Sequence, residues 1–399
     1  MKIKVSVQRI FILLLMIMPL IDTFNGMFIR NNDSVMNIGQ VYRIIIFILL
    51  LLLFKNIKKQ LAAILIVLFS VFCFIQVLLP VPYYISNVIL CLKLFIPIFM
   101  IFVFEGLIKN NKILFQDTIK IFDVISFITP FTIIIPYLFR TGYRTYDGSA
   151  GYLGFYFATN EISFVISSCV MYLVTRLDKL AGWKYLFLLV LNISSVLLIG
   201  TKSALAVVGA CIFLYIFRFI IKKQRGSLKK LFVILAVIIT IIAGFRLFAD
   251  NLNSVYIRWL YGRQQNPGTS FLFFLTSGRT GRIETAWREF HNGSLTQILF
   301  GWGLAGGNYA KPYVEMDYFD LLFSAGWAGL IVILFLYIYC LKSININFWS
   351  LIFLSFAFVL IFAGGHVLYA GLGGMMNALL ITYLISYSFI KTRTGKTEG

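Results

Sequence analysis

The residues best suited to chemistry lie in one stretch of the sequence, between residues 250 and 316. Arginines recur there, with Arg258 early in the stretch and Arg279, Arg282 and Arg288 grouped later. A guanidinium group stays charged at any working pH, and its planar fork binds two phosphate oxygens at once. We therefore interpret these arginines as ligands for a phosphate-bearing substrate. The alternative is an interfacial amphipathic helix whose arginines contact lipid phosphates.

Residues 282–290 have the period of an amphipathic helix. Apolar side chains at i, i+3, i+4 and i+7 share one face, namely Ile283, Ala286, Trp287 and Phe290. Asn292-Gly293 then supplies a C-terminal stop. The arginines project from other faces, and Glu284 precedes Arg288 by four residues, which is the spacing of an ordinary surface pair.

Three carboxylates follow at the end of this stretch. In a helix Asp317 and Asp320 share a face at the outer end of an apolar run, and Glu315 lies just before them. Carboxylates that enter a membrane span are costly, so they tend to be paired or functional. Three interpretations stay open: acidic residues favoured by the helix dipole, a base or acceptor for a substrate hydroxyl, and a divalent metal site. No histidine accompanies them to select a metal, so we expect none.

Other candidate residues stand outside this cluster. Lys202 lies in a very short turn that would aim it at an anion, and Asn160 opens an apolar run. Gly301–Gly306 matches the GxGxxG dinucleotide pattern, but no strand precedes it, so we reject a nucleotide site. His291 and His366 are isolated and are interpreted as structural. The five cysteines lie inside apolar runs and are interpreted as small buried hydrophobes.

The elements that must position these residues are membrane helices. The chain is 60% hydrophobic and 13% charged, whereas soluble domains are about half apolar and a quarter charged. Apolar runs of about 17–25 residues cross a hydrocarbon layer of about 30 Å. Twelve such runs are predicted, at residues 8–28, 38–54, 61–80, 84–108, 119–139, 151–175, 183–200, 203–221, 230–249, 318–341, 347–363 and 370–390. The predicted fold class is an all-α integral membrane protein, a polytopic bundle of about 12 transmembrane helices.

Basic residues predict the orientation of this bundle. Most of the 35 lysines and arginines fall on one side of the predicted spans, which the positive-inside rule makes the cytoplasmic side. Both termini lie on that side, and residues 250–316 form one long external loop between helices 9 and 10. Residues 1–399 are predicted to form a single polytopic membrane domain. The net charge of +20 therefore reflects topology, and no nucleic-acid partner is expected.

These features, in this order, resemble the bacterial O-antigen ligase and O-antigen or capsular polysaccharide polymerase family. The resemblance covers most of the chain, including the twelve spans and the long external loop. Five local motifs carry it: the Thr/Ser-x-Ser-Arg/Lys-like turn at Thr201–Ala204, the Asn after a Gly- and aromatic-rich approach at Asn160, the Gly-Arg…Trp stretch at Arg279–Trp287, the Phe-Gly-x-Gly turn at Phe300–Gly303, and the span-ten Gly-x-x-Gly at Gly326–Gly329.

One departure from the family pattern is informative. Many relatives, the ligases especially, place His-Asn where this chain has Glu315-Met316. The acidic Glu-x-Asp form is more similar to polymerases of capsule or other surface polysaccharides. The catalytic histidine of the ligases is therefore not carried over to this chain.

The resemblance implies a metal- and cofactor-independent glycosyltransferase in the bacterial cytoplasmic membrane. It would move a growing glycan from undecaprenyl diphosphate onto a lipid-linked repeat unit, on the outer face. Arg279 and Arg282 would stabilise the leaving diphosphate. Further diphosphate contacts are assigned to Lys202, Arg258 and Arg288, and substrate contacts to Asn160 and Asp320.

Glu315 or Asp317 would take the proton from the attacking sugar hydroxyl. Nearby arginines lower the pKa of a carboxylate, so orienting that hydroxyl is expected to matter more than proton affinity. The expected partners are a lipid-linked oligosaccharide, membrane lipid and other polysaccharide-assembly proteins. Two alternatives remain: a ligase that transfers glycan to another acceptor, and a flippase or transporter, whose site would lie near the bilayer midplane.

Overall fold

The structure is a computed structural model of the chain. It describes residues 6–31, 38–79, 84–145, 151–180, 182–221, 278–305 and 314–394, with single positions between 235 and 276. Its internal contacts group the chain into two compact units. The first comprises Met1–Leu15, Gly39–Lys120 and Ser270–Gly399, and the second comprises Met16–Ile38 and Ile121–Thr269. We describe each unit by itself.

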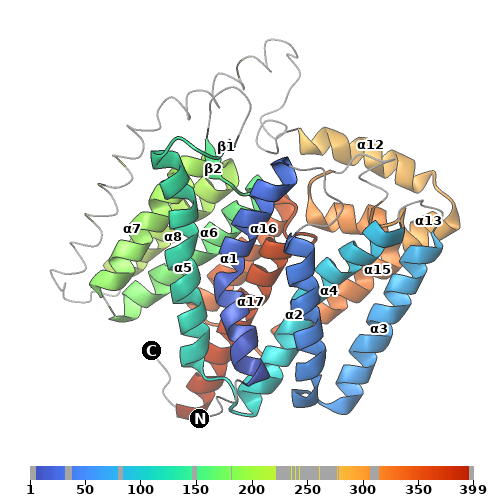
Figure 1. The fold of residues 1–399 in the computed structure, drawn as a ribbon, viewed down its shortest axis with the longest axis horizontal. Helices are drawn as coiled ribbons and strands as arrows, with labels where there is room; N and C mark the ends of the chain where they lie inside the picture. Colours follow the sequence, from blue (N-terminus) through green and yellow to red (C-terminus); the bar gives the residue numbers. More distant parts are fainter. Residues whose placement is uncertain are drawn as a thin grey trace. The chain divides into compact units, whose positions relative to one another are not determined.

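The described elements are helices, apart from one small sheet (Figure 1). The first unit contains α2 (Ile38–Leu53), η1 (Phe54–Asn56), α3 (Lys59–Leu78), α4 (Tyr84–Lys109), α12 (Arg279–His291), α13 (Leu295–Phe300), α15 (Asp317–Leu341), α16 (Phe348–Gly364) and α17 (Gly371–Thr394). The second unit contains β1 (Tyr143–Arg144), β2 (Tyr152–Gly154), α6 (Thr159–Leu180), α7 (Trp183–Ile199) and α8 (Lys202–Ile221). Two helices begin in one unit and end in the other: α1 (Val7–Asn31) and α5 (Phe115–Leu138).

These helices match the predicted spans closely. Each predicted span except the ninth, residues 230–249, overlaps a described helix, and only single positions of the ninth are described. Among the described residues, 7 helices are long and apolar enough to cross a membrane. The chain is therefore a helical, polytopic membrane protein, and the count of twelve spans stays a prediction.

The sixth predicted span, residues 151–175, begins too early and needs correction. The chain at Tyr152–Gly154 pairs antiparallel with Tyr143–Arg144, and the helix begins only at Thr159. Gly151 and Gly154 have φ angles of +76° and +66°. These left-handed conformations are available to glycine and incompatible with a continuous helix. The apolar composition of this stretch concealed the break.

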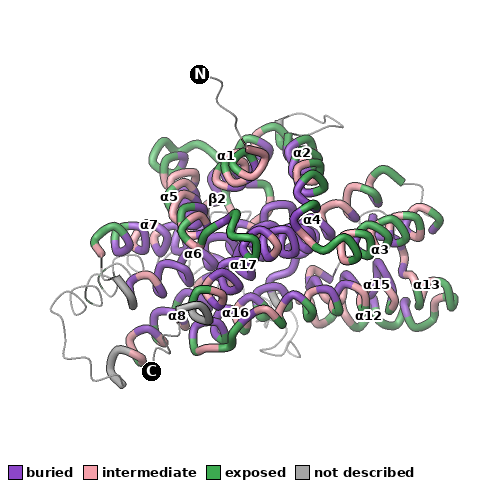
Figure 2. Tube along the Cα trace, turned by 90° about the horizontal axis from the view of Figure 1, so that it is seen from below, coloured by how far each residue is buried: buried purple, intermediate pink, exposed green. Residues whose placement is uncertain are grey.

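The core of the first unit is built on α4 and α17. These helices pack along one another, and both are buried over most of their length (Figure 2). Gly374 of α17 lies against Pro97 of α4, where an added Cβ would come within 2.8 Å of the proline ring. The helix α3 is more apolar than either of them, yet few of its residues are buried, which is the pattern of a helix that faces lipid.

Connections that the topology assigns to the cytoplasm meet at one end of the first unit. The Asn56 carbonyl accepts a hydrogen bond from Asn110, and its side-chain oxygen accepts one from Lys112. The Ser343 hydroxyl donates to the Glu105 carboxylate at this same end. The connections after the second, fourth and tenth predicted spans therefore lie together, as alternating crossings require. Which end faces outward stays a prediction.

Candidate functional site

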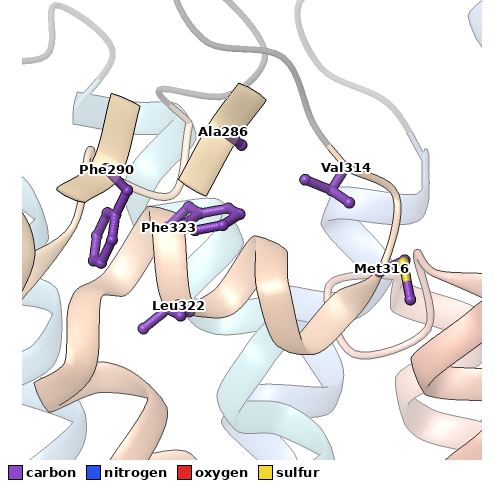
Figure 3. Close-up of a cluster of buried hydrophobic side chains, with 6 residues drawn as sticks. All are labelled: Ala286, Phe290, Val314, Met316, Leu322 and Phe323. Carbon is purple, nitrogen blue, oxygen red and sulfur yellow. The ribbon is translucent and has the colours of Figure 1, made fainter. Parts of the chain in front are cut away.

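The helix α12 confirms the predicted amphipathic pattern, and it packs on protein. Figure 3 shows Ala286 and Phe290 of α12 above Phe323 of α15, with Leu322 below; Val314 and Met316 belong to the same cluster and lie where the chain enters α15. The Phe290 and Phe323 rings lie 5.3 Å apart between centroids, a separation at which aromatic pairs stabilise each other by about 0.5–1.5 kcal/mol. This apolar floor fixes the helix in one orientation, so its arginines project in defined directions.

Arg279 and Arg282 converge on one carboxylate. They lie three residues apart on α12 and so share a face. Arg282 Nη1 lies 2.9 Å from Glu315 Oε1, and Arg279 Nη2 lies 3.3 Å from Glu315 Oε2. The Arg279 side chain is 12% exposed, whereas the side chains of Arg282 and Glu315 are each 36% exposed. The arginines that sequence analysis ranked first are therefore brought together with Glu315, in a place that solvent reaches.

The electrostatics of this cluster make Glu315 a poor base. Partial burial raises the pKa of its carboxyl, but the hydrogen bond from Arg282 and the charges of Arg282 and Arg279 outweigh burial, and the net pKa is lowered. Glu315 therefore stays ionised at neutral pH. Two guanidinium groups against one carboxylate leave a net positive charge at the site, which favours an anionic ligand.

His366 belongs to the same cluster, although sequence analysis interpreted it as structural. Gly365 packs on the Glu315 backbone, where a Cβ would come within 2.0 Å of the Glu315 carbonyl oxygen. Burial lowers the pKa of the His366 imidazole below its ordinary 6.5; the Glu315 charge raises it, and Arg279 and Arg282 lower it further. The imidazole is therefore neutral at pH 7 and able to accept a proton.

The backbone at both residues is strained. Glu315 has a φ angle of +64° and His366 one of +58°. Non-glycine residues in this left-handed region cost about 1–3 kcal/mol and cluster at functional sites, where the surrounding structure enforces them. That enforcement here comes from Asp317 and Asp320.

Both aspartates are buried and hold backbone in place. Asp317 Oδ2 accepts hydrogen bonds from the Val367 and Leu368 amides, at 2.7 and 2.8 Å. Asp320 Oδ1 accepts from the Val314 amide at 2.8 Å, and Oδ2 accepts from the Met316 amide at 3.0 Å. Asp320 thereby fixes the chain on both sides of Glu315, and Asp317 fixes the chain just after His366. These contacts support a positioning role for the two aspartates.

Asp320 accepts amide hydrogen bonds with both carboxylate oxygens, whereas Asp317 accepts both of its amide hydrogen bonds with one oxygen, and this difference can be tested. An asparagine at 320 has only one acceptor oxygen, so it strands one of two buried amides, at a cost of about 1–3 kcal/mol. An asparagine at 317 keeps both amide bonds on a single oxygen. Asp320→Asn is therefore expected to lower the melting temperature of the purified protein more than Asp317→Asn. Equal losses would contradict the separate roles of the oxygens.

The glycine turn after α13, residues 301–305, supports the part of α15 on which α12 packs. Trp302 and Gly303 amides donate to the Phe323 and Ser324 carbonyls, each at 2.9 Å. Those carbonyls are available because α15 breaks at Gly326, which has a φ angle of +68° and a ψ angle of −177°. The Leu304 amide donates to Gln76, on α3.

The Ala305 amide likewise donates to Asn87, on α4, so four successive amides of this turn bond to other segments of the protein. A nucleotide-binding loop instead points its amides at phosphate. These contacts support rejecting the dinucleotide interpretation of the GxGxxG match.

The remaining predicted residues lie elsewhere. Arg288 pairs with Glu284 at 3.2 Å on the exposed side of α12, so it is not brought to Glu315, and the expected surface pair is confirmed. Arg258 lies outside the described residues. Lys202 and Asn160 belong to the second unit, in which Ser163, near the start of α6, contacts Thr201 beside Lys202, at 2.8 Å between hydroxyls. The roles assigned to these residues stay predictions.

A metal-binding arrangement is not found in the described ranges. There, no three or more histidine, cysteine, aspartate or glutamate side chains are placed to hold an ion. The five cysteines, all described, are free and at least half-buried, with four of them fully buried. Independently of this, two guanidinium groups beside one neutral imidazole support anion binding at the cluster.

His366 was missed because its neighbours Glu315, Arg282 and Arg279 lie 51, 84 and 87 residues before it in the chain. One signal was available, since Gly364-Gly365-His366 stands in the connection after the eleventh predicted span. Alternating crossings place that connection on the same side as residues 250–316. The predicted topology would therefore have placed the histidine at the face of the membrane where the arginines were expected.

Comparison with known proteins agrees with this architecture. The family model of O-antigen ligase like membrane proteins matches residues 5–255. Neither curated proteins nor solved structures yield a match. The matched segment ends before α12, so the geometry at Arg279, Arg282 and Glu315 is evidence independent of the match. Since the match spans more than half of the 399 residues, this chain belongs to the O-antigen ligase-like family of membrane proteins.

Proposed function

We propose that this protein is a polysaccharide polymerase of the outer face of the bacterial cytoplasmic membrane. It transfers a growing glycan from undecaprenyl diphosphate onto a lipid-linked repeat unit. One observation carries the proposal: Arg279 and Arg282 converge on the solvent-accessible Glu315 carboxylate, beside the neutral His366. Family membership is consistent with a membrane protein that processes lipid-linked glycans.

In the proposed reaction, the bond between C1 of the donor sugar and the diphosphate oxygen breaks. The two electrons of that bond leave with the diphosphate, and Arg279 and Arg282 stabilise the charge that develops there. Fixed guanidinium groups do this better than water because they need no reorganisation. The acceptor hydroxyl oxygen forms the new bond to C1, and its proton passes to His366.

Glu315 serves as the resident counterion in this scheme. Its two oxygens occupy one arginine each, in the way two phosphate oxygens would. A diphosphate that displaces it brings more negative charge beside His366, which raises the pKa of the imidazole and strengthens it as a base. The substrate therefore improves the base at the moment it binds.

Reconstitution tests the function directly. Purified protein in vesicles with lipid-linked repeat units, and with no nucleotide, is expected to produce a ladder of longer glycans. Movement of the repeat unit across the bilayer without elongation would instead identify a flippase. Transfer only to a different acceptor would identify a ligase.

The pH dependence of the ladder tests the base. Protonated His366 cannot accept a proton, so kcat/KM, which reports the protein without substrate, is expected to fall on the acid side, below the ordinary histidine pKa of 6.5. His366→Gln is expected to remove this acid limb and slow elongation by about 10²–10⁴-fold. His291→Gln, which changes the exposed histidine at the end of α12, is the matched control. An unchanged acid limb in His366→Gln would assign the proton elsewhere.

A further inference from the structure

Two of the five cysteines meet across a pair of apolar helices. Cys73 lies on α3 and Cys91 on α4, and a hydrogen bond joins their thiols. Cys91 is buried, whereas Cys73 is partly exposed. The other three cysteines lie on separate helices, α6, α8 and α15. Cys73 and Cys91, called the thiol pair below, are therefore placed to react with each other.

Contacts on either side of the thiol pair show that it lies in the interface between the two helices. On one side, the Asn87 side chain of α4 donates a hydrogen bond to the Gln76 backbone carbonyl of α3, at 2.9 Å. On the other side, the rings of Phe72 and Phe95 lie 5.4 Å apart between centroids. These contacts make α3 and α4 antiparallel neighbours, and both cysteines lie between them, within about one turn of each contact.

The thiol pair lies near the end of these helices that the predicted topology places outside the cell. Cys73 is within about two turns of the end of α3 at Leu78, and Cys91 is within about two turns of the start of α4 at Tyr84. Disulfides form and persist outside the cytoplasm. Because Cys73 is partly exposed on a helix that is mostly exposed, a lipid-soluble oxidant can reach it.

The residues one turn from the thiol pair hold the glycine turn in place. The Leu304 amide donates to Gln76 Oε1 at 2.8 Å, and the Ala305 amide donates to Asn87 Oδ1 at 2.7 Å. Both acceptor side chains are buried, and they belong to different helices. The turn therefore keeps both hydrogen bonds only while α3 and α4 stay together.

We propose that Cys73 and Cys91 are a redox-active dithiol, which closes to a disulfide and thereby locks α3 to α4 beside the glycine turn. The oxidant is a molecule that carries a disulfide. One cysteine thiolate attacks it and displaces a thiolate, and the second cysteine attacks the mixed disulfide and displaces the other. A sulfur–sulfur bond forms between the two cysteines. The oxidant accepts two electrons and ends as two thiols, which carry the two protons.

This chemistry is independent of the proposed glycan transfer, but its structural effect reaches the arginine helix. The glycine turn bonds to the Phe323 and Ser324 carbonyls of α15, and Phe323 packs under Phe290 of α12. A disulfide that fixes the turn therefore stabilises the part of α15 on which α12 packs.

Oxidation of the wild-type protein tests the thiol pair. The full chain, purified with its thiols reduced and placed in lipid nanodiscs, is treated with dithiodipyridine, a small lipid-soluble disulfide. Peptide mapping without reductant is expected to find Cys73 joined to Cys91, with no thiopyridyl group left on either cysteine. A thiopyridyl group that stays on Cys73, without the bond to Cys91, would overturn the proposal.

Two serine variants check the assignment. Cys91→Ser removes the second thiol, so Cys73 is expected to keep its thiopyridyl group. Cys340→Ser changes a buried cysteine of α15 in the same unit and is the matched control, in which the bond between Cys73 and Cys91 is expected to form as in the wild type. Release of the thiopyridyl group from Cys73 in Cys91→Ser would contradict the pairing. The wild-type oxidation decides the question even if a variant misfolds.

Amide hydrogen exchange tests the lock. The Leu304 and Ala305 amides are expected to exchange about tenfold or more slowly in the oxidised protein than in the reduced protein, because opening between α3 and α4 is suppressed. The Trp302 and Gly303 amides bond to carbonyls of α15 instead, so their exchange is expected to change less. Equal exchange of Leu304 and Ala305 in the two forms would overturn the lock.

Discussion

Arg282→Ala is expected to abolish the elongation ladder while leaving the protein folded in the membrane. The lost guanidinium lies 2.9 Å from Glu315 and stabilises the leaving diphosphate in the proposed reaction. Removing one fixed donor from such a site costs about 10²–10³-fold in rate. The side chain is only partly buried, so stability is expected to change little. Elongation rates and the melting temperature, measured on the same preparation, check both parts.

Two further variants test whether the effect depends on the guanidinium group at position 282. Arg282→Lys keeps the charge but loses the planar fork, so it is expected to restore only part of the rate. Arg288→Ala removes an arginine from the same helix that pairs with Glu284 on the exposed side, so it is expected to have a small effect. If both alanine variants lose the ladder equally, the general charge of α12 matters rather than the pair at Glu315.

Gly326→Ala is expected to have the largest effect on folding. A Cβ at this position would lie 2.3 Å from the Leu299 carbonyl carbon and 2.4 Å from the Phe300 nitrogen, both backbone atoms. The backbone at Gly326, with φ +68° and ψ −177°, lies in a region essentially restricted to glycine and costs about a further 1–3 kcal/mol for any other residue. The break in α15 would move, the Phe323 and Ser324 carbonyls would lose the glycine turn, and the floor beneath α12 would shift. Thermal unfolding and elongation are both expected to suffer.

A second glycine supplies the control for this substitution. Gly209 lies inside α8 with no other atom within 4 Å of an added Cβ. Alanine is more favourable than glycine in a helix interior by up to about 1 kcal/mol, so Gly209→Ala is expected to hold or raise the melting temperature. A Gly326→Ala protein as stable as the wild type would show that the break in α15 is not required.

The spans and α12 could be predicted because each rests on local information. Apolar runs of spanning length report burial in lipid, and the period of Ile283, Ala286 and Phe290 reports one packed face. The same helical geometry places Arg279 and Arg282 together whatever surrounds them. The start of α6 escaped prediction, because composition does not reveal the positive φ angles of Gly151 and Gly154.

The different roles of the three acidic residues could not be predicted from the sequence. Asp317 and Asp320 differ from Glu315 only through the amides they meet, and Val367 and Leu368 lie 50 residues or more beyond Asp317. Such partners depend on how the last two helices return to the site. For the same reason, sequence analysis could neither bring His366 to the cluster nor exclude Arg288 from it.

The pairing of α4 with α17 has a consequence for how the protein is made. These helices are separated by more than 250 residues, which a ribosome takes tens of seconds to add at about 5–20 residues per second. During that interval the face of α4 that will receive Gly374 has no native partner. During membrane insertion α4 must therefore remain without its native partner until α17 has been synthesised. A message truncated before Gly371 would encode a protein that lacks α17 and cannot form the core of the first unit.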